Sequence, residues 1–157
     1  MKIIILFLCF IFASDLYSQN YHFNQHEVST DLLRMNPSSI FRYKNELLFI
    51  GTKEGLIAFD GKKHDVMVRE DGGNQEPSSY FHDGEYLWIG YSDGGIFRLV
   101  DFKLKPWEIA EGWPKSKITG IEKDNIGQMW FSTYGEGLYV FVKEVLYNFN
   151  TDHGLQG

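Results

Sequence analysis

Aromatic rings and cations at five positions are the side chains of this sequence best suited to binding a ligand: Arg69, Tyr91, Trp113, Lys115 and Tyr134. The rings offer flat apolar surfaces, and the cations offer charge-assisted hydrogen bonds to anionic groups. This combination suits a sugar or an anionic glycan, and we predict a ligand site at these positions. For Trp113 the alternative is that it packs with Pro114 in a turn between two repeats.

Residues that could perform catalysis or hold a metal are sparse. The sequence contains no Gly-x-Ser-x-Gly elbow, no His-Glu-x-x-His zinc helix and no phosphate-binding P-loop. Paired polar side chains occur at His22/His26, Asp83/Glu85 and Glu122/Asp124. The histidines lie too far apart in a strand to chelate a metal, and the carboxylates fall near turns, where they are solvated. Asp93-Gly94-Gly95 lacks the further acidic ligands that calcium needs. We therefore expect no enzyme, no metal and no cofactor.

Composition narrows the classes of partner. The net charge is −6, and no Lys/Arg cluster is present, so we expect no nucleic-acid partner. After the N-terminal segment no apolar run of about 18 or more residues remains, so we expect no membrane span. The aromatic fraction of 17% is high, and most of these rings are expected to fill the core.

The N-terminal segment 1–18 is typical of a signal peptide. Lys2 supplies a positive charge, and residues 3–13 form an apolar stretch of 11 residues, too short to span a bilayer as a helix. Cleavage between Ser18 and Gln19 would leave a small residue before the cut. Cys9 is interpreted as a hydrophobic signal residue, so the mature chain has no cysteine. The protein is predicted to be exported to the periplasm.

One phrase occurs three times, at 48–56 (LFIGTKEGL), 87–96 (LWIGYSDGGI) and 129–138 (MWFSTYGEGL). Its aromatic anchors Phe49, Trp88 and Trp130 are 39 and 42 residues apart. A repeat of about 40–45 residues made of short strands is the period of a β-propeller blade. The predicted fold is all-β, with four-stranded antiparallel blades forming about three blades of an incomplete ring. The exposed blade faces at both ends predict an oligomeric or aggregation-prone chain.

The predicted domain occupies residues 19–157. Its blades are placed at about 38–70, 78–110 and 117–150, with a possible closing strand at 21–29 and the start of a fourth blade at 154–157. In the third repeat the strands are expected at 118–122, 128–133, 138–142 and 145–149.

Alternation along the second strand of each repeat predicts how the blades stack. Phe49, Trp88 and Trp130 should point to one face of their sheets, and their sequence neighbours to the other. Both faces are then apolar, as a blade between two other blades requires. Asp60-Gly61 and Asp83-Gly84 are expected at equivalent hairpin turns, where such pairs favour tight primed turns.

The string Gly-x-Leu-Trp-Ile-Gly-Thr-x-x-Gly-Gly-Leu resembles the two-component regulator propeller repeat. The phrase Gly-Leu-Ile-Ala-Phe-Asp-Gly at 55–61 and the tail 147–155 are similar to that family's blade opening and inter-blade link. The resemblance covers residues 21–157. Departures are Phe49 for the usual tryptophan, a shorter first loop, and Ser132 for the usual glycine. Family sensors carry two propellers of about seven blades each, a β-sandwich, a membrane helix and a kinase, and the later parts do not occur in this sequence.

The resemblance implies an extracytoplasmic sensor module that binds a glycan-derived ligand, here as an N-terminal fragment without membrane helix or kinase. Two alternatives remain: a propeller scaffold for a protein partner, and a polysaccharide-acting propeller enzyme. The expected partners are the ligand and either the remaining blades of a parent protein or a second copy. Loops between second and third strands and loops between blades should emerge on one side, where the five candidate residues lie.

Overall fold

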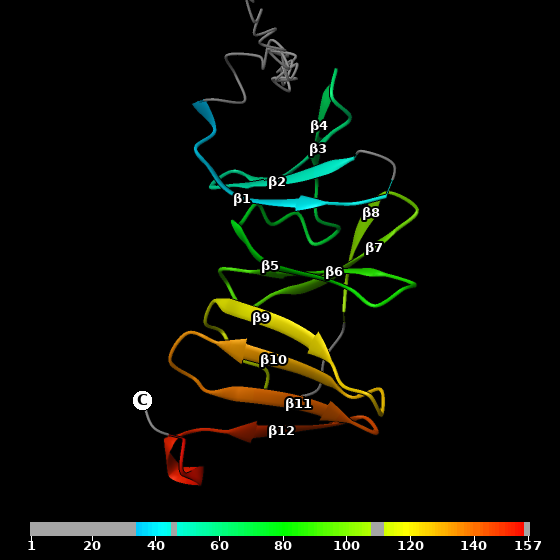
Figure 1. Ribbon diagram of the computed structural model, residues 1–157. Coiled ribbons are helices and arrows are strands. Elements are labelled where there is room, and N and C mark those ends of the chain that lie inside the picture. The colour runs from blue at the N-terminus through cyan, green and yellow to red at the C-terminus, as the bar shows by residue number, and fades with distance from the viewer. Residues whose placement is uncertain (1–33, 45–46, 108–111, 156–157) are drawn as a thin grey trace, which may run out of the picture.

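The computed structural model describes residues 34–44, 47–107 and 112–155. The predicted signal peptide (1–18) and closing strand (21–29) lie outside the described residues, as do residues 156–157 of the predicted fourth blade. The described residues form three four-stranded antiparallel sheets, each with its strands in sequence order. Figure 1 shows the sheets stacked one upon another without closing into a ring. The all-β, incomplete propeller predicted from the repeats is therefore confirmed.

Each sheet is called a blade and numbered along the chain. Blade 1 contains β1 (Pro37–Arg42), β2 (Leu48–Thr52), β3 (Gly55–Phe59) and β4 (His64–Met67). Blade 2 contains β5 (Pro77–His82), β6 (Leu87–Tyr91), β7 (Ile96–Val100) and β8 (Lys103–Pro106). Blade 3 contains β9 (Ile118–Lys123), β10 (Met129–Thr133), β11 (Leu138–Val142) and β12 (Val145–Phe149), followed by a short 3-10 helix, η1 (Thr151–His153).

The core lies between the blades, as the alternation in the second strands predicted. Phe49 of blade 1 packs with Leu87 and Ile89 of blade 2 in one buried cluster. Trp88, the residue between these two, points the other way into a second cluster with Met129 and Phe131 of blade 3. Because a strand places successive side chains on opposite faces, one strand supplies both clusters. Removing these apolar side chains from water between the blades is their main contribution to the stability of the fold.

Aspartates hold the turns between the first and second strands of blades 2 and 3. Asp83 accepts hydrogen bonds from two backbone N–H groups and from the indole Nε1 of Trp88 at 3.0 Å. Asp124 accepts hydrogen bonds from two backbone N–H groups of its own turn and from the indole Nε1 of Trp130, the last at 2.9 Å. Blade 1 has Tyr43 at this place, and its ring packs against Phe49 with centroids 5.6 Å apart. Blade 1 thus has Phe49 in place of the tryptophan and Tyr43 in place of the aspartate that binds the indole in the other blades.

The turn prediction for Asp60-Gly61 and Asp83-Gly84 was wrong. The first pair joins β3 to β4 and the second joins β5 to β6, so the two turns are not equivalent. In both, only the glycine has positive φ, and the aspartate carboxylate accepts from N–H groups two and three residues later. Two consecutive residues with positive φ, the pattern of a primed two-residue hairpin, occur instead at Asp101-Phe102 and Lys143-Glu144.

Candidate functional site

Loops from different blades meet at one edge of the array, here called the loop edge. The loops between second and third strands contact the connections between blades. Ser92 N–H donates to Glu76 O at 2.9 Å, Tyr134 N–H donates to Lys117 O at 2.9 Å, and the Trp113 indole donates to Gly94 O at 2.7 Å. The loop edge is therefore a continuous surface of hydrogen-bonded loops.

Arg69, in the connection between blades 1 and 2, is the most buried cation of the loop edge, with 6% of its surface exposed. Its Nε donates to Asp71 Oδ1 at 3.0 Å, and its Nη1 donates to Asp93 Oδ2 at 2.9 Å. The guanidinium carbon lies 4.7 Å from the ring centre of Tyr91 and 4.2 Å from that of Phe97. These five residues are called the Arg69 cluster. Through its contacts, Arg69 links the connection between blades 1 and 2 to the β6–β7 loop and to the core beneath them.

The charges in the Arg69 cluster stabilise one another. Burial lowers the pKa of Arg69, but hydrogen bonds to Asp71 and Asp93 outweigh it and raise this pKa. The hydrogen bond from Arg69 lowers the pKa of Asp71. Burial raises the pKa of Tyr91 well above its ordinary value, so the phenol stays neutral. One cation therefore faces two carboxylates, and the cluster carries a surplus negative charge.

Glycine at position 94 is required by the close approach of a backbone carbonyl, and Gly95 is closely surrounded by side chains. Gly94 has φ +86°, and a Cβ there would lie 2.4 Å from the carbonyl oxygen of Pro114. A Cβ on Gly95 would lie 3.1 Å from the Phe97 ring and 3.3 Å from Nη2 of Arg69. The two glycines allow the β6–β7 loop to contact the Arg69 cluster on one side and the connection to blade 3 on the other.

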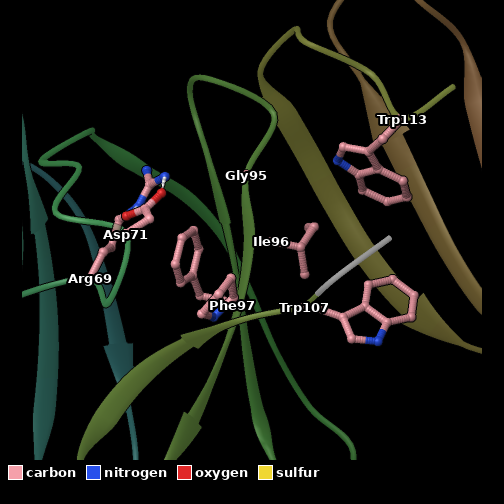
Figure 2. Close-up of a pocket in the computed structure, with 8 residues that line it drawn as sticks. Arg69, Asp71, Gly95, Ile96, Phe97, Trp107 and Trp113 are labelled. Atoms are coloured by element: carbon pink, nitrogen blue, oxygen red, sulfur yellow. Dashed lines mark hydrogen bonds and ion pairs between the residues drawn. The ribbon is translucent and has the colours of Figure 1, made fainter. Parts of the chain in front are cut away.

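A pocket of about 220 Å³ opens beside this loop. Its lining residues are Arg69, Asp71, Gly95, Ile96, Phe97, Pro106, Trp107 and Trp113. Figure 2 shows the charged pair on one side of the loop and the two tryptophans on the other. The tryptophan rings meet edge to face, with centroids 6.0 Å apart. The pocket thus combines two indole rings with one half-exposed carboxylate, that of Asp71.

The five residues predicted from the sequence are placed differently. Arg69 and Trp113 line the pocket. Tyr91 is 1% exposed and lies beneath Arg69 in the core. Lys115 and Tyr134 are exposed on neighbouring loops and do not line the pocket, with Tyr134 76% exposed. Trp113 also packs against Phe131 and donates to Gly94, so the packing alternative describes part of its role.

Asp71 and Trp107 were not among the residues predicted from the sequence, and Asp93 was considered there only as a calcium ligand. A signal for the carboxylates was present, because Asp-Gly-Gly occurs at 71–73 and again at 93–95. Both aspartates bind the same guanidinium. Trp107 opens the connection that also holds Trp113, and its ring packs 4.9 Å from that of Phe141.

Among the described residues, no group of three or more His, Cys, Asp or Glu side chains could hold a metal ion. The His22/His26 pair lies outside the described residues. In the same part of the chain, no helix has the length and apolar character needed to cross a membrane.

No protein-family model matches the chain, and no curated protein matches it. Among solved structures, it is similar to the extracellular domain of the hybrid two-component system BT3049 from B. thetaiotaomicron. The identity is 28%, the TM-score is 0.57, and the match covers 76% of this chain and 18% of that one. The extracellular domain of BT4673 from the same organism matches at 23% identity and TM-score 0.56, over 73% of this chain and 17% of that one.

PorZ, a surface component of the type-IX secretion system of Porphyromonas gingivalis, matches at 15% identity and TM-score 0.57. The match covers 76% of this chain and 22% of PorZ. This chain therefore spans about a fifth of the length of these structures. The similarity to extracellular domains of two-component systems, predicted from the repeated phrase, is confirmed.

Proposed function

We propose that this chain is part of the extracytoplasmic sensor region of a two-component signalling protein, and that its loop edge recognises a glycan-derived ligand. The observation that carries the proposal is the 28% identity to the extracellular domain of BT3049, a two-component protein. In the intact protein, occupancy of the loop edge would be relayed to a kinase. The module binds its ligand and performs no reaction on it.

The pocket beside the β6–β7 loop favours a neutral ligand over an anionic one. The positive charge of Arg69 is already matched by Asp71 and Asp93, so it offers little attraction to a sulfate or carboxylate. Asp71 is 42% exposed, and its carboxylate can accept further hydrogen bonds from hydroxyl groups. The indoles of Trp107 and Trp113 supply apolar surface. These features fit a neutral sugar, whose hydroxyls donate to Asp71 while its C–H face packs on an indole.

The test is calorimetric titration of the chain with a pool of neutral oligosaccharides from plant and fungal polysaccharides. The same pool after chemical sulfation is the matched anionic probe. We expect the neutral pool to bind and to raise Tm, and the sulfated pool to bind at least tenfold more weakly. A ligand at about 100 times its Kd adds roughly 2.7 kcal/mol to the free energy of unfolding.

Variants identify the binding surface. Trp113→Leu should reduce affinity at least tenfold, because it removes one indole from the pocket. Tyr134→Leu is the matched control, since this exposed ring lies on the loop edge outside the pocket lining, and it should bind as the natural chain does. Circular dichroism checks that both variants are folded. Binding of neither pool would contradict ligand recognition and favour the scaffold alternative.

A further inference from the structure

The pocket beside the β6–β7 loop has a negatively charged side. Asp71 and Asp93 both bind Arg69, so two carboxylates face a single guanidinium. The hydrogen bond from Arg69 holds the pKa of Asp71 below its ordinary value, so this carboxylate stays ionised at neutral and mildly acidic pH. The pocket therefore offers a ligand a carboxylate whose charge the protein does not fully balance.

The neighbouring loops do not supply the missing positive charge. The segment 70–76, which follows Arg69, contains three acidic residues and no lysine or arginine. Lys115 and Lys117 belong to the connection to blade 3, where both are exposed and neither lines the pocket. In the described part of the chain, neither lysine forms an ion pair with the two aspartates. A cation that balances this side of the pocket would thus come from the ligand.

Asp71 also retains hydrogen-bonding capacity. Its Oδ1 accepts from Arg69 Nε and from the Gly73 N–H, both at 3.0 Å, and its Oδ2 accepts from Arg69 Nη2. An ionised carboxylate has about four acceptor sites, so these bonds leave one open on Oδ2. The side chain is 42% exposed, so a ligand can reach it. A protonated amine bound there gains the attraction of opposite charges, which a hydroxyl group does not.

The apolar part of the pocket restricts what can carry this amine. Figure 2 shows Asp71 on one side of the β6–β7 loop and Trp107 and Trp113 on the other. A ligand that uses both sides therefore needs a cation in one place and a flat apolar face in another. A sugar ring with an amino substituent has both, whereas a small alkyl amine has only the cation. The negative face of an indole also favours a ring that carries positive charge.

We propose that the ligand of this pocket is an oligosaccharide containing an amino sugar whose amine is free and protonated. Its ammonium group donates to Oδ2 of Asp71, and its ring packs on Trp107 or Trp113. The proposal rests on the glycan recognition proposed above and adds the charge of the ligand to it. The expected order of affinity is cationic sugar first, neutral sugar second and anionic sugar last.

The experiment compares oligosaccharides that differ only in the charge of the amine. The probes are glucosamine and galactosamine oligomers with free amines, and the same oligomers after N-acetylation. Each is titrated into the 157-residue chain by calorimetry at mildly acidic pH, where the free amines are protonated. We expect a free-amine oligomer to bind at least tenfold more tightly than its acetylated form. The difference should shrink at high salt, because salt screens the attraction between the charges.

Two variants locate the charge that the ligand senses. Asp71→Asn should remove the preference, so that free-amine and acetylated oligomers bind equally. Glu70→Gln is the matched control, because it removes the charge of an adjacent exposed carboxylate that does not line the pocket, and it should keep the preference. If Asp71 only supported the fold, its replacement would weaken both oligomers alike and leave their ratio unchanged. Circular dichroism checks the folding of the variants, and the salt series on the natural chain needs no variant.

The outcomes separate this proposal from the recognition of a glycan in general. Equal binding of the two forms by the natural chain would overturn it, and so would tighter binding of the acetylated form. A preference that persists in folded Asp71→Asn would do the same. If the neutral oligosaccharide pool binds while no amino sugar does, the amino sugar is wrong and glycan recognition stands. If no sugar of any kind binds, the proposed function fails as well.

Discussion

At the scale of single residues, Asp83 and Asp124 determine how the second strands of blades 2 and 3 enter the core. Each carboxylate satisfies backbone donors of its turn and also fixes the indole that follows. A tryptophan buried between blades needs a partner for its N–H, and the turn aspartate provides one. In blade 1 neither the indole nor the carboxylate is present, and two packed rings replace them.

The first prediction concerns Asp83, whose side chain is only 5% exposed. Burial raises its pKa, but hydrogen bonds from Tyr86, Trp88 and Glu85 outweigh burial and lower the pKa from 3.8 to about 2. A lowered pKa in the folded state contributes stability that is present above pH ~4 and lost as the pH falls to ~2. Asp83→Asn should reduce the free energy of unfolding at pH 7 by about 2 kcal/mol.

Urea unfolding at a series of pH values checks this prediction. The natural chain should lose stability between about pH 4 and pH 2, and Asp83→Asn should show a smaller loss over that interval. Asp65→Asn is the control, because this exposed carboxylate on β4 has no hydrogen bond among the described residues. Equal pH dependence in the natural chain and Asp83→Asn would show that the carboxylate does not stabilise the fold.

The second prediction concerns Arg69. Arg69→Met keeps the apolar stem over Tyr91 and Phe97 but leaves two carboxylates without their cation. Removing one partner of a buried ion pair costs about 3–5 kcal/mol. Because the two aspartates are partly exposed, we expect a loss nearer 2–3 kcal/mol in urea unfolding. Arg69→Lys should recover little, since an ammonium cannot make the two parallel bonds to Asp71.

Arg98→Met is the matched control for Arg69→Met. Arg98 also lies over aromatic rings, those of Tyr86 and Trp88, but it has no ion pair among the described residues. Its replacement should cost about 1 kcal/mol or less. Equal losses for the two methionine variants would mean that ring contacts, and not the paired carboxylates, give Arg69 its importance.

Residue types alone did not reveal the charge state of the pocket. The sequence predicted that Arg69 helps to bind a sugar or an anionic glycan, and in the structure its charge is matched by Asp71 and Asp93. The reason is spatial: Asp93 lies 24 positions away in the sequence and reaches Arg69 only when blade 2 stacks on blade 1. Propensity and spacing describe single elements, whereas this ion pair depends on how two blades meet.

At the scale of elements, the sequence predicted strands well because their signals are local and periodic. In blade 3 the sequence predicts strands at 118–122, 128–133, 138–142 and 145–149. The structure has them at Ile118–Lys123, Met129–Thr133, Leu138–Val142 and Val145–Phe149. Apolar alternation fixes the register of each strand, and Asp-x-x-Gly marks the turn at 124–127. The primed hairpin at Lys143-Glu144 could not be predicted, because neither residue type favours positive φ.

That hairpin gives the third prediction. Lys143 has φ +46° and Glu144 has φ +67°, a conformation that costs an ordinary residue roughly 1 kcal/mol. Replacing the pair by Asn-Gly should raise the free energy of unfolding by about 1 kcal/mol, measured in urea. Ile126→Gly is the control, because Ile126 has no positive φ and glycine there should be neutral or destabilising. A loss of stability on introducing Asn-Gly would contradict the assigned turn.

At the scale of the whole molecule, the fold is shared by proteins with different roles. The structures similar to this chain include extracellular domains of two-component systems and a component of a secretion system. Stacked blades provide a rigid support, and binding residues are commonly carried on loops that such a support positions. The shared fold therefore does not determine the function, and the chemistry particular to this chain lies in the pocket beside the β6–β7 loop and its surplus negative charge.

The most direct test of ligand recognition at the loop edge is amide hydrogen exchange with and without the neutral oligosaccharide pool. Ligand binding at the loop edge should slow exchange in residues 92–97 and 112–115, which flank the pocket, and leave Val145–Phe149 unchanged. Slower exchange confined to other segments, or no change at any concentration of the pool, would contradict it.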